Sequence, residues 1–431
     1  MRKTLEQYRS FAWPIRFLMV NQLSINLGFY MLMPYLAAHL AGDLGLAAAM
    51  VGFVLGVRNL SQQGLFLVGG SLADRFGYKP LIVAGCVLRT AGFMLLGFVD
   101  SIPALIVASA ATGFAGALFN PAVRAYLAHD AGERRVDAFA TFNVFYQAGI
   151  LLGPLVGLVL TGIDFQLTCL VAAAVFGVLS VIQVRALPAR HADADAPDRD
   201  RPSVLAHWRT VARNRRFVVF SAAMIGSYVL SFQMYLALPL EAKRLASTDL
   251  AATIAVSVLF AVSGLIAVAG QLRIVEACKR RWNPGQCLTI GLLLIGAGFV
   301  PPLLAAGWHP VTDGSLPQQA VLYAPLMISA VVLTLGTIVV YPFEMDTIVS
   351  LSGDRLVATH YGLYSTICGI GITAGNFLTG GVLDLARTNH LPALPWLCLV
   401  ALGLACAAAL HTLQRTGRLA PAPLEATATA I

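Results

Sequence analysis

Charged side chains within long apolar segments are the residues of this sequence best placed to do chemistry. Glu344 and Asp346 end one apolar run, and an acid held inside a membrane is a candidate carrier of a proton. Arg58 lies about ten residues, or roughly 15 Å, into another apolar run. A guanidinium at that depth is costly unless it faces water, a carboxylate or backbone carbonyls. The sequence therefore offers a proton site and a fixed positive charge.

The two acids also have an ordinary structural interpretation. A helix from Gln319 to Glu344 would be about 37 Å long at about 1.5 Å per residue, so both acids would lie near the membrane rim. There they could pair with Arg281 or Arg355 as a gate. A proton-binding role and a gate role both remain open.

The intramembrane arginines have two interpretations as well. Arg58 and Arg89 have no Asp or Glu at a similar depth in the first five apolar runs, so Asn59, Gln62, Gln63 or backbone carbonyls would have to satisfy them. Alternatively, Arg58 faces a cavity and binds an anionic or zwitterionic ligand, for which its planar fork suits a carboxylate better than Lys does.

The composition requires membrane-spanning helices to position these residues. Of 431 residues 58% are hydrophobic and 12% are charged, which is too apolar for a soluble domain of this size. Apolar stretches long enough to cross about 30 Å of hydrocarbon recur along the chain. We expect an all-α integral membrane protein with twelve transmembrane helices, at residues 13–38, 48–72, 80–99, 103–127, 138–161, 166–187, 217–240, 251–274, 286–306, 319–343, 358–385 and 395–413.

These helices are expected to form two pseudo-symmetric six-helix bundles. Residues 1–187 form the first bundle, residues 188–216 a cytoplasmic linker too polar to bury a core, and residues 217–431 the second bundle with a short tail. Gly-x3-Gly spacings at 149–153 and 371–375 support such an internal repeat.

The basic residues orient the chain in the bilayer. Most of the 29 Lys and Arg fall in segments that alternate on one side of the membrane, which predicts that both termini are cytoplasmic in a multi-pass protein of a bacterial inner membrane. Lys243, Arg244 and Arg387 fall on the other side. This distribution explains the formal charge of +8 without a nucleic-acid partner.

Several function classes are not supported by the sequence. No spacing of Cys or His suits a metal, no group of residues suggests catalysis, and no Walker GxxxxGK[ST] motif is present. We therefore expect neither an enzyme nor an ATP-driven pump, and no cofactor.

The charged turn at residues 70–80 has a specific pattern. Gly77 suits a position with positive φ, and Asp74 can accept hydrogen bonds from unpaired N–H groups at the start of a neighbouring helix. The stretch resembles the GxLaDrxGrkxx loop of the major facilitator superfamily, matching it at Gly70, Leu72, Ala73, Asp74, Arg75, Gly77 and Lys79 but not at Tyr78. The resemblance implies a carrier whose halves are latched on the cytoplasmic side, with Gly70, Asp74, Arg75, Gly77, Lys79 and Arg124 as gate or latch residues.

The fifth predicted helix has a second motif. Gly149, Gly153 and Gly157 form a smooth face that lets another helix approach, and Pro154 removes a backbone hydrogen bond. The run resembles the gxxxGPxxGG motif of antiporters in this superfamily, except that Leu158 replaces the last Gly. The resemblance implies a seal on the outer side that limits leak; generic helix packing is the alternative.

Further residues resemble the MdtH branch of bacterial multidrug:proton antiporters. They are Arg58-x3-Gln62-Gln63-Gly64, Arg89 and Pro121-x2-Arg124. The Arg usual in the fourth helix of drug antiporters is missing, because residues 109–113 read Ser-Ala-Ala-Thr-Gly, and the first helix contains no acid. These departures leave the charge of the cargo open.

Amides, phenols and one arginine of the central helices suit a broad amphipathic pocket between the bundles. Each could instead be a helix–helix hydrogen bond. The candidate substrate-binding residues are Asn21, Asn26, Tyr30, Arg58, Gln62, Tyr146, Gln147, Tyr228, Gln233 and Tyr361.

Three functions fit the sequence. The first is a monomeric, proton-coupled antiporter in the lipid bilayer that exports amphipathic small molecules. The second is a carrier for one anionic metabolite, such as a carboxylate siderophore, in either direction. The third is a non-transporting scaffold, against which the loop at 70–80 argues, because a scaffold needs no latch.

Overall fold

The computed structural model describes residues 2–46, 48–161, 163–188, 203–308 and 316–419, which form helices and no strand. This confirms the predicted all-α fold class. The helices of the first half are α1 Arg2–Arg9, α2 Trp13–Tyr30, α3 Met33–Gly42, α4 Ala48–Gly64, α5 Phe66–Phe76, α6 Tyr78–Phe98, α7 Ile102–Ala131, η1 Gly132–Arg134, α8 Arg135–Thr161 and α9 Phe165–Ala186. Those that follow are α10 Val204–Arg213, α11 Arg215–Ser231, η3 Phe232–Met234, α12 Ala237–Leu245, α13 Asp249–Arg281, α14 Pro284–Ala297, α15 Val300–Leu304, α16 Leu316–Ser352, α17 Val357–Thr388 and α18 Leu394–Arg415.

Several predicted spans are broken helices. Nine segments of the described chain are long and apolar enough to cross a membrane, and one of them, Ile102–Thr161, comprises α7, η1 and α8. The segments α2–α3 and α4–α5 fall outside that set. The first break is followed by Pro34 and the second is preceded by Gly64, and both residue types weaken a helix. The number of twelve spans stays a prediction.

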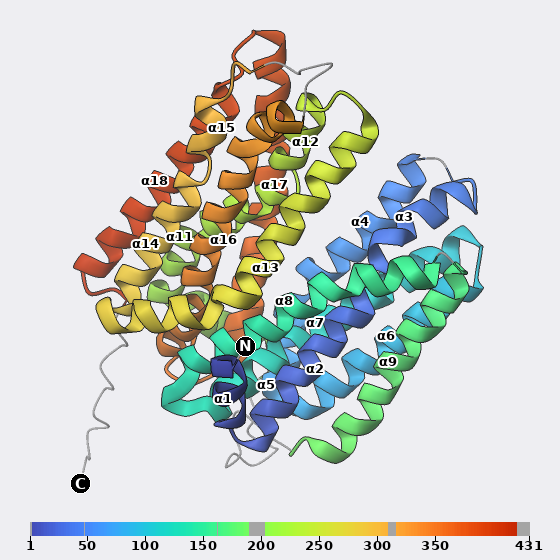
Figure 1. Ribbon diagram of the computed structural model, residues 1–431. Coiled ribbons are helices and arrows are strands. Elements are labelled where there is room, and N and C mark those ends of the chain that lie inside the picture. The colour runs from blue at the N-terminus through green and yellow to red at the C-terminus, as the bar shows by residue number, and fades with distance from the viewer. Residues whose placement is uncertain (1, 47, 162, 189–202, 309–315, 420–431) are drawn as a thin grey trace.

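The helices pack as two groups that meet along a limited set of elements. Helices α2–α9 form one group and α11–α18 the other (Figure 1). Between the groups, α5 and α4 contact α17, while α8 contacts α13 and α16. In Figure 1 the groups meet around α5 and α8 and diverge toward α3 and α12.

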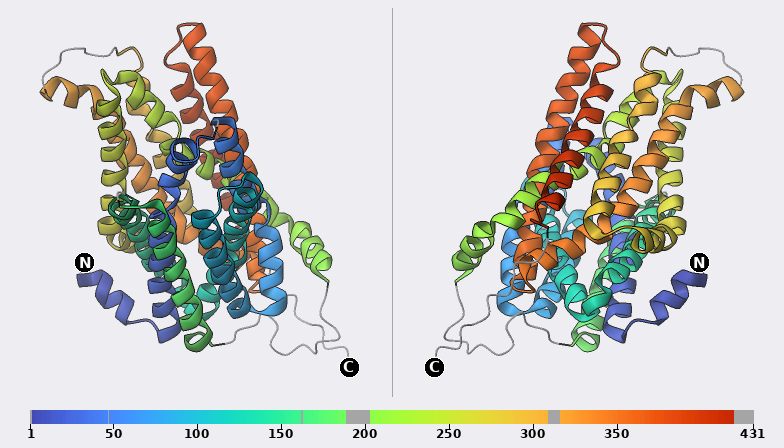
Figure 2. Two further views of the ribbon diagram at one scale, coloured as in Figure 1. Left: turned by 90° about the vertical axis from the view of Figure 1, so that its right-hand side faces the viewer. Right: turned by 90° about the vertical axis from the view of Figure 1, so that its left-hand side faces the viewer.

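The described end of the predicted linker is a helix that packs across both groups. Helix α10 contacts α5 of the first group and α11 and α17 of the second. The Nε1 of Trp208 donates a hydrogen bond to Ser71 Oγ at 2.6 Å. Figure 2 shows α10 (light green) and α1 (dark blue) toward the same end of the molecule. Because 189–202 lie outside the described residues, the predicted domain boundaries stay a prediction.

The glycines of the second motif bring α8 against α2 inside the first group. A Cβ on Gly153 would lie 2.7 Å from the Cβ of Tyr30, and one on Gly157 would lie 2.0 Å from the backbone oxygen of Met31. The hydroxyl of Tyr35 donates to the carbonyl of Pro154 at 2.6 Å. The motif therefore permits direct backbone contact between α2 and α8; its role as a seal stays a prediction.

We expect Gly153→Leu to overpack the contact between α2 and α8. Such overpacking costs about 1–3 kcal/mol of stability, so thermal unfolding of the purified protein should begin at lower temperature and vesicles should leak protons without cargo. The control is Gly380→Leu in α17, because no atom lies within 4 Å of the position its Cβ would take. Equal unfolding and leak in the two variants would reduce the motif to an incidental run of glycines.

Candidate functional site

A buried carboxylate joins the two groups of helices. Asp74, near the end of α5, is 5% exposed, and its Oδ1 accepts a hydrogen bond from the backbone N–H of Ala358 at 3.1 Å. Its Oδ2 accepts from both the N–H and the Oγ1 of Thr359, each at 2.6 Å. These donors belong to the first turn of α17, whose N-cap residue Leu356 offers no side-chain acceptor. The first group of helices therefore caps a helix of the second, where the dipole favours a negative charge.

Glycines allow α5 and α17 to come this close. A Cβ on Gly70 would lie 2.1 Å from the carbonyl oxygen of Ala358, and one on Gly362 would lie 2.5 Å from that of Phe66. Gly77 has a φ of 92°, which a side chain would disfavour, and it turns the chain from α5 into α6.

The remaining predicted latch residues lie around this contact. The guanidinium of Arg75 lies 5.6 Å from the ring centroid of Phe76, and Lys79 is half-buried in the first turn of α6. Arg124 of α7 crosses to the other group, because its Nη1 donates to Ser365 Oγ of α17 at 3.3 Å.

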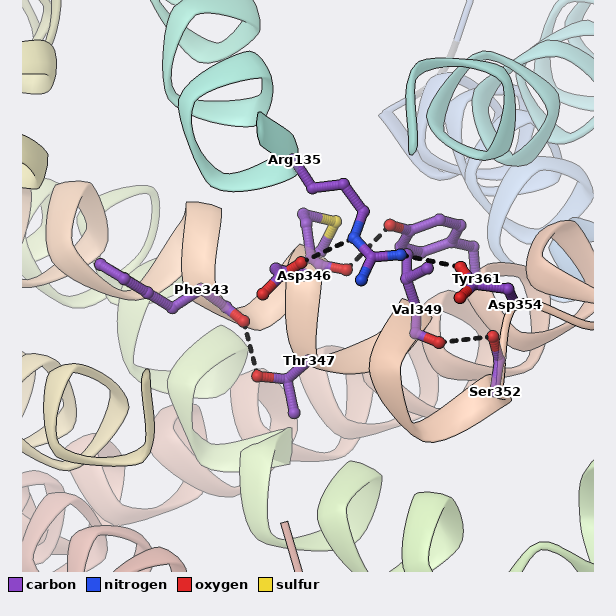
Figure 3. Close-up of polar contacts among 9 residues, drawn as sticks. Arg135, Phe343, Asp346, Thr347, Val349, Ser352, Asp354 and Tyr361 are labelled. Atoms are coloured by element: carbon purple, nitrogen blue, oxygen red, sulfur yellow. Dashed lines mark hydrogen bonds and ion pairs between the residues drawn. The ribbon is translucent and has the colours of Figure 1, made fainter. Parts of the chain in front are cut away.

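A second connection between the groups is ionic (Figure 3). Arg135, the first residue of α8, lies between two carboxylates, with its Nε 2.9 Å from Asp346 Oδ1 and its Nη1 2.7 Å from Asp354 Oδ1. Nearby, Lys279 Nζ of α13 lies 2.7 Å from Asp137 Oδ1 of α8. Arg135 and Asp346 are only about one-fifth exposed, so their pair is better shielded from solvent than an ordinary surface ion pair.

The predicted helix end at Glu344 and Asp346 is wrong, whereas the position of Glu344 near the membrane rim stays a prediction. Helix α16 does not end at the two acids but continues to Ser352, so Glu344 lies about 12 Å from the end of the helix. Its side chain is 2% exposed. Among the described residues it forms no ion pair with Arg281 or Arg355, the alternative expected from the sequence. Of the two acids it is Asp346 that takes part in an ion pair.

Glu344 instead lies in a cluster that includes both groups. The hydroxyl of Tyr364, on α17, donates a hydrogen bond to Glu344 Oε1. The ring of Tyr364 meets that of Tyr228 edge-on, with centroids 5.9 Å apart. Arg124 of the first group donates a hydrogen bond to Ser365, the residue next to Tyr364. Hydrogen bonds thus join α17 both to the acid on α16 and to the cation on α7.

The intramembrane arginines of the first group have neutral partners. Arg58 donates to Gln62 Oε1 at 3.3 Å and to the side chain of Asn59. Arg89, 3% exposed, donates from Nη2 to the carbonyl oxygen of Thr112 at 3.0 Å. Amides and a carbonyl therefore satisfy part of each guanidinium, which is the structural interpretation that the sequence left open.

Some predicted pocket residues are buried in helix contacts. Asn21 Oδ1 accepts from Gln183 Nε2 at 2.8 Å, between α2 and α9. Gln233 is fully buried and donates to Asn376 Oδ1 at 3.3 Å. Tyr361 is fully buried, with its hydroxyl bonded to a backbone carbonyl of α16. These three side chains hold helices together.

The side chains of the other predicted pocket residues are partly exposed, as binding a ligand requires, except that of Asn26. Asn26 is buried and donates to the backbone carbonyl of Tyr146 at 2.9 Å. The residues with half-buried side chains are Tyr30, Arg58, Gln62, Tyr146, Gln147 and Tyr228.

Sequence reasoning missed the cross-group partners. Neither Arg135 nor Asp354 is among the residues predicted from the sequence; Arg135 begins α8, and Asp354 lies in the turn between α16 and α17. Asn143 Nδ2 donates to Gln271 Oε1 at 2.8 Å, and both are buried between α8 and α13. An amide in an apolar run gives no sign of its partner, so this pair could not have been found.

We expect Asp74→Asn to weaken the cytoplasmic contact, because an amide nitrogen would replace one of the two acceptors that face N–H donors. Hydrogen bonds to a charged group contribute about 1.5–3 kcal/mol, so transport should fall about tenfold or more while membrane insertion stays normal. Asp384→Asn, which changes an acid that is 78% exposed, is the matched control. Wild-type turnover of Asp74→Asn in proteoliposomes would make the loop a simple connector.

Comparison with known proteins identifies the family to which this chain belongs. The family model of the Major Facilitator Superfamily matches residues 18–376. An uncharacterized MFS-type transporter of Mycobacterium tuberculosis is 53% identical over 407 residues, 94% of each chain. The multidrug resistance protein MdtH of Yersinia enterocolitica is 30% identical over 394 residues, covering 90% of this chain and 91% of that protein.

Solved structures agree in fold. The human organic anion transporter MFSD10 is similar with a TM-score of 0.62 at 17% identity, covering 92% of this chain and 98% of that one. An auto-inhibited POT family peptide transporter has a TM-score of 0.65 at 16% identity, with 94% and 97% covered. The chain is therefore a multi-pass membrane transporter that belongs to the major facilitator superfamily.

Proposed function

We propose that the protein is a proton-coupled antiporter that exports amphipathic small molecules across a bacterial inner membrane by alternating access. The similarity to MdtH, a multidrug resistance protein, over nine-tenths of the chain supports this proposal. The moving units would be the bundles 1–187 and 217–431, which the linker 188–216 joins. The protein would work as a monomer, and both termini would be cytoplasmic. Partners would be the cargo, protons and lipid.

The observation on which the proposal rests is the burial of Glu344 beside Tyr364. Burying an acid inside a membrane costs free energy, so an acid found there is taken as a candidate functional residue. Asp346 is the weaker proton candidate, since Arg135 already balances its charge. We therefore assign the coupling proton to Glu344 and a gate role to Asp346.

The proposed coupling is electrostatic. Ionised Glu344 attracts Arg124, which belongs to the other bundle, and this attraction favours the arrangement in which the bundles meet at α5 and α17. A proton on Glu344 removes the attraction and makes separation of the bundles less costly. Because α17 provides Tyr364, Ser365 and the N–H groups bound by Asp74, movement at the acid would be transmitted along one helix to the latch.

A carrier for an anionic metabolite remains the second candidate. Arg58 and Arg89 favour it, because no carboxylate among the described residues forms an ion pair with either. A non-transporting scaffold is the third, and the connections made by Asp74 and Arg135 across the bundles argue against it, since a scaffold does not need a reversible gate.

We expect Glu344→Gln to abolish accumulation driven by an imposed proton gradient while sparing cargo binding and downhill exchange. Proteoliposomes loaded with a panel of amphipathic fluorescent dyes of either charge provide the measurement. Glu276→Gln is the matched control, because Glu276 pairs with Arg280 at an exposed position of α13.

Accumulation that persists in Glu344→Gln would place the coupling proton elsewhere. If the wild-type protein moves no dye under any gradient, the scaffold interpretation takes precedence over transport.

A further inference from the structure

Two arginines share one aromatic ring inside the first bundle. The guanidinium carbon of Arg58 lies 5.2 Å from the ring centroid of Phe29, and that of Arg89 lies 4.9 Å from the same centroid. Arg89 also lies 4.9 Å from the ring centroid of Phe119 and 5.4 Å from that of Phe176. Cation–π contacts lower the cost of burying each cation, but they leave its charge in place.

The hydrogen bonds of this cluster do not neutralise it either. Among the described residues the two guanidiniums donate hydrogen bonds to side-chain amides and to a backbone carbonyl, and the buried Nε of Arg89 has no partner. Repulsion between two like charges adds to the cost of desolvating them. Two uncompensated cations at membrane depth are expensive to keep, which points to an anion that is present for part of the cycle.

Gln62 links the two arginines into one site. Its Oε1 accepts from Arg58 Nη1 at 3.3 Å. Its Cδ lies 3.1 Å from the place that a Cβ on Gly116 would take, and Arg89 Nη2 lies 2.7 Å from the same place. The glycine leaves room for the amide and the guanidinium to lie side by side.

The two arginines differ in access. Arg58 is half-buried, so its guanidinium can meet a ligand, whereas Arg89 is only 3% exposed. We infer that Arg58 binds a carboxylate of the cargo through its planar fork, and that Arg89 is a positioning residue that strengthens the local positive charge. The half-buried Tyr30, whose ring packs edge-on against Phe29, offers aromatic surface for the apolar body of the same molecule.

This inference rests on the proposed function only in assuming that cargo reaches the region between the bundles, and it names the class of cargo: amphipathic molecules with a carboxylate beside an aromatic body. It does not depend on the coupling ion or on the direction of transport.

The test uses three probes with one aromatic body and different charge: naphthalene-2-carboxylate, naphthalene-2-carboxamide and 2-naphthylmethylammonium. Isothermal titration calorimetry on the full-length protein in detergent, without a proton gradient, gives the affinity of each. We expect the carboxylate to bind about tenfold to a hundredfold tighter than the amide, the range of a charge-assisted hydrogen bond. The ammonium probe should bind more weakly than either.

Variants separate the two roles. Arg58→Gln should remove the preference for the carboxylate over the amide, and Arg58→Lys should restore only part of it, because an ammonium lacks the two-pronged geometry. Arg89→Gln should lower the preference without changing the affinity for the amide, which a purely structural defect would not do. Arg134→Gln is the control, since Arg134 also lies over a ring, that of Phe11 at 4.2 Å, but away from this site.

Equal affinities for carboxylate and amide, or failure of all three probes to bind a protein that unfolds at its normal temperature, would overturn the inference. So would a preference that survives in both Arg58→Gln and Arg89→Gln. Because no gradient is applied, these outcomes are independent of the Glu344→Gln experiment that tests proton coupling.

Discussion

The hydrogen bonds from the start of α17 to the carboxylate of Asp74 are the constraint on which the rest of this structure depends. The N–H groups of Ala358 and Thr359 would otherwise be unpaired, because α17 has no cap of its own. The acceptor comes from the opposite bundle, so the start of α17 is fully satisfied only while the bundles are together. Ser365 and Tyr364 lie about two turns further along the same helix, which places the Arg124 and Glu344 contacts on the element that Asp74 holds.

The arginines within the helices of the first bundle and the buried acid of the second contribute to one total charge. Arg58, Arg89 and Arg124 are positive in the first bundle, and Glu344 is a buried acid of the second. Each is costly in isolation. We propose that a proton on Glu344 removes the one negative charge of this set and that a cargo carboxylate at Arg58 supplies another, which would couple the occupancy of one site to that of the other.

The fold class and the loop at 70–80 could be predicted from the sequence, since membrane helices follow from apolar run length and the loop has a dense local pattern. The positive φ of Gly77 also follows from local rules. The burial of Glu344 could not, because in the sequence the apolar run stops at the acids, whereas helix α16 continues to Ser352. Pairs such as Arg135 with Asp346 are separated by more than two hundred residues, so only tertiary structure brings them together.

The distance between spin labels at Glu133 and Arg281, exposed residues on opposite bundles, measures most directly whether a proton on Glu344 separates the bundles. Electron–electron double resonance would be recorded in mildly alkaline and mildly acidic solution, with the exposed Cys398 replaced by Ser. We expect a short distance in alkali, a longer population in acid, and that longer population in both solutions for Glu344→Gln. An acid-induced change that is the same with and without Glu344, or no change in the wild-type protein, would contradict it.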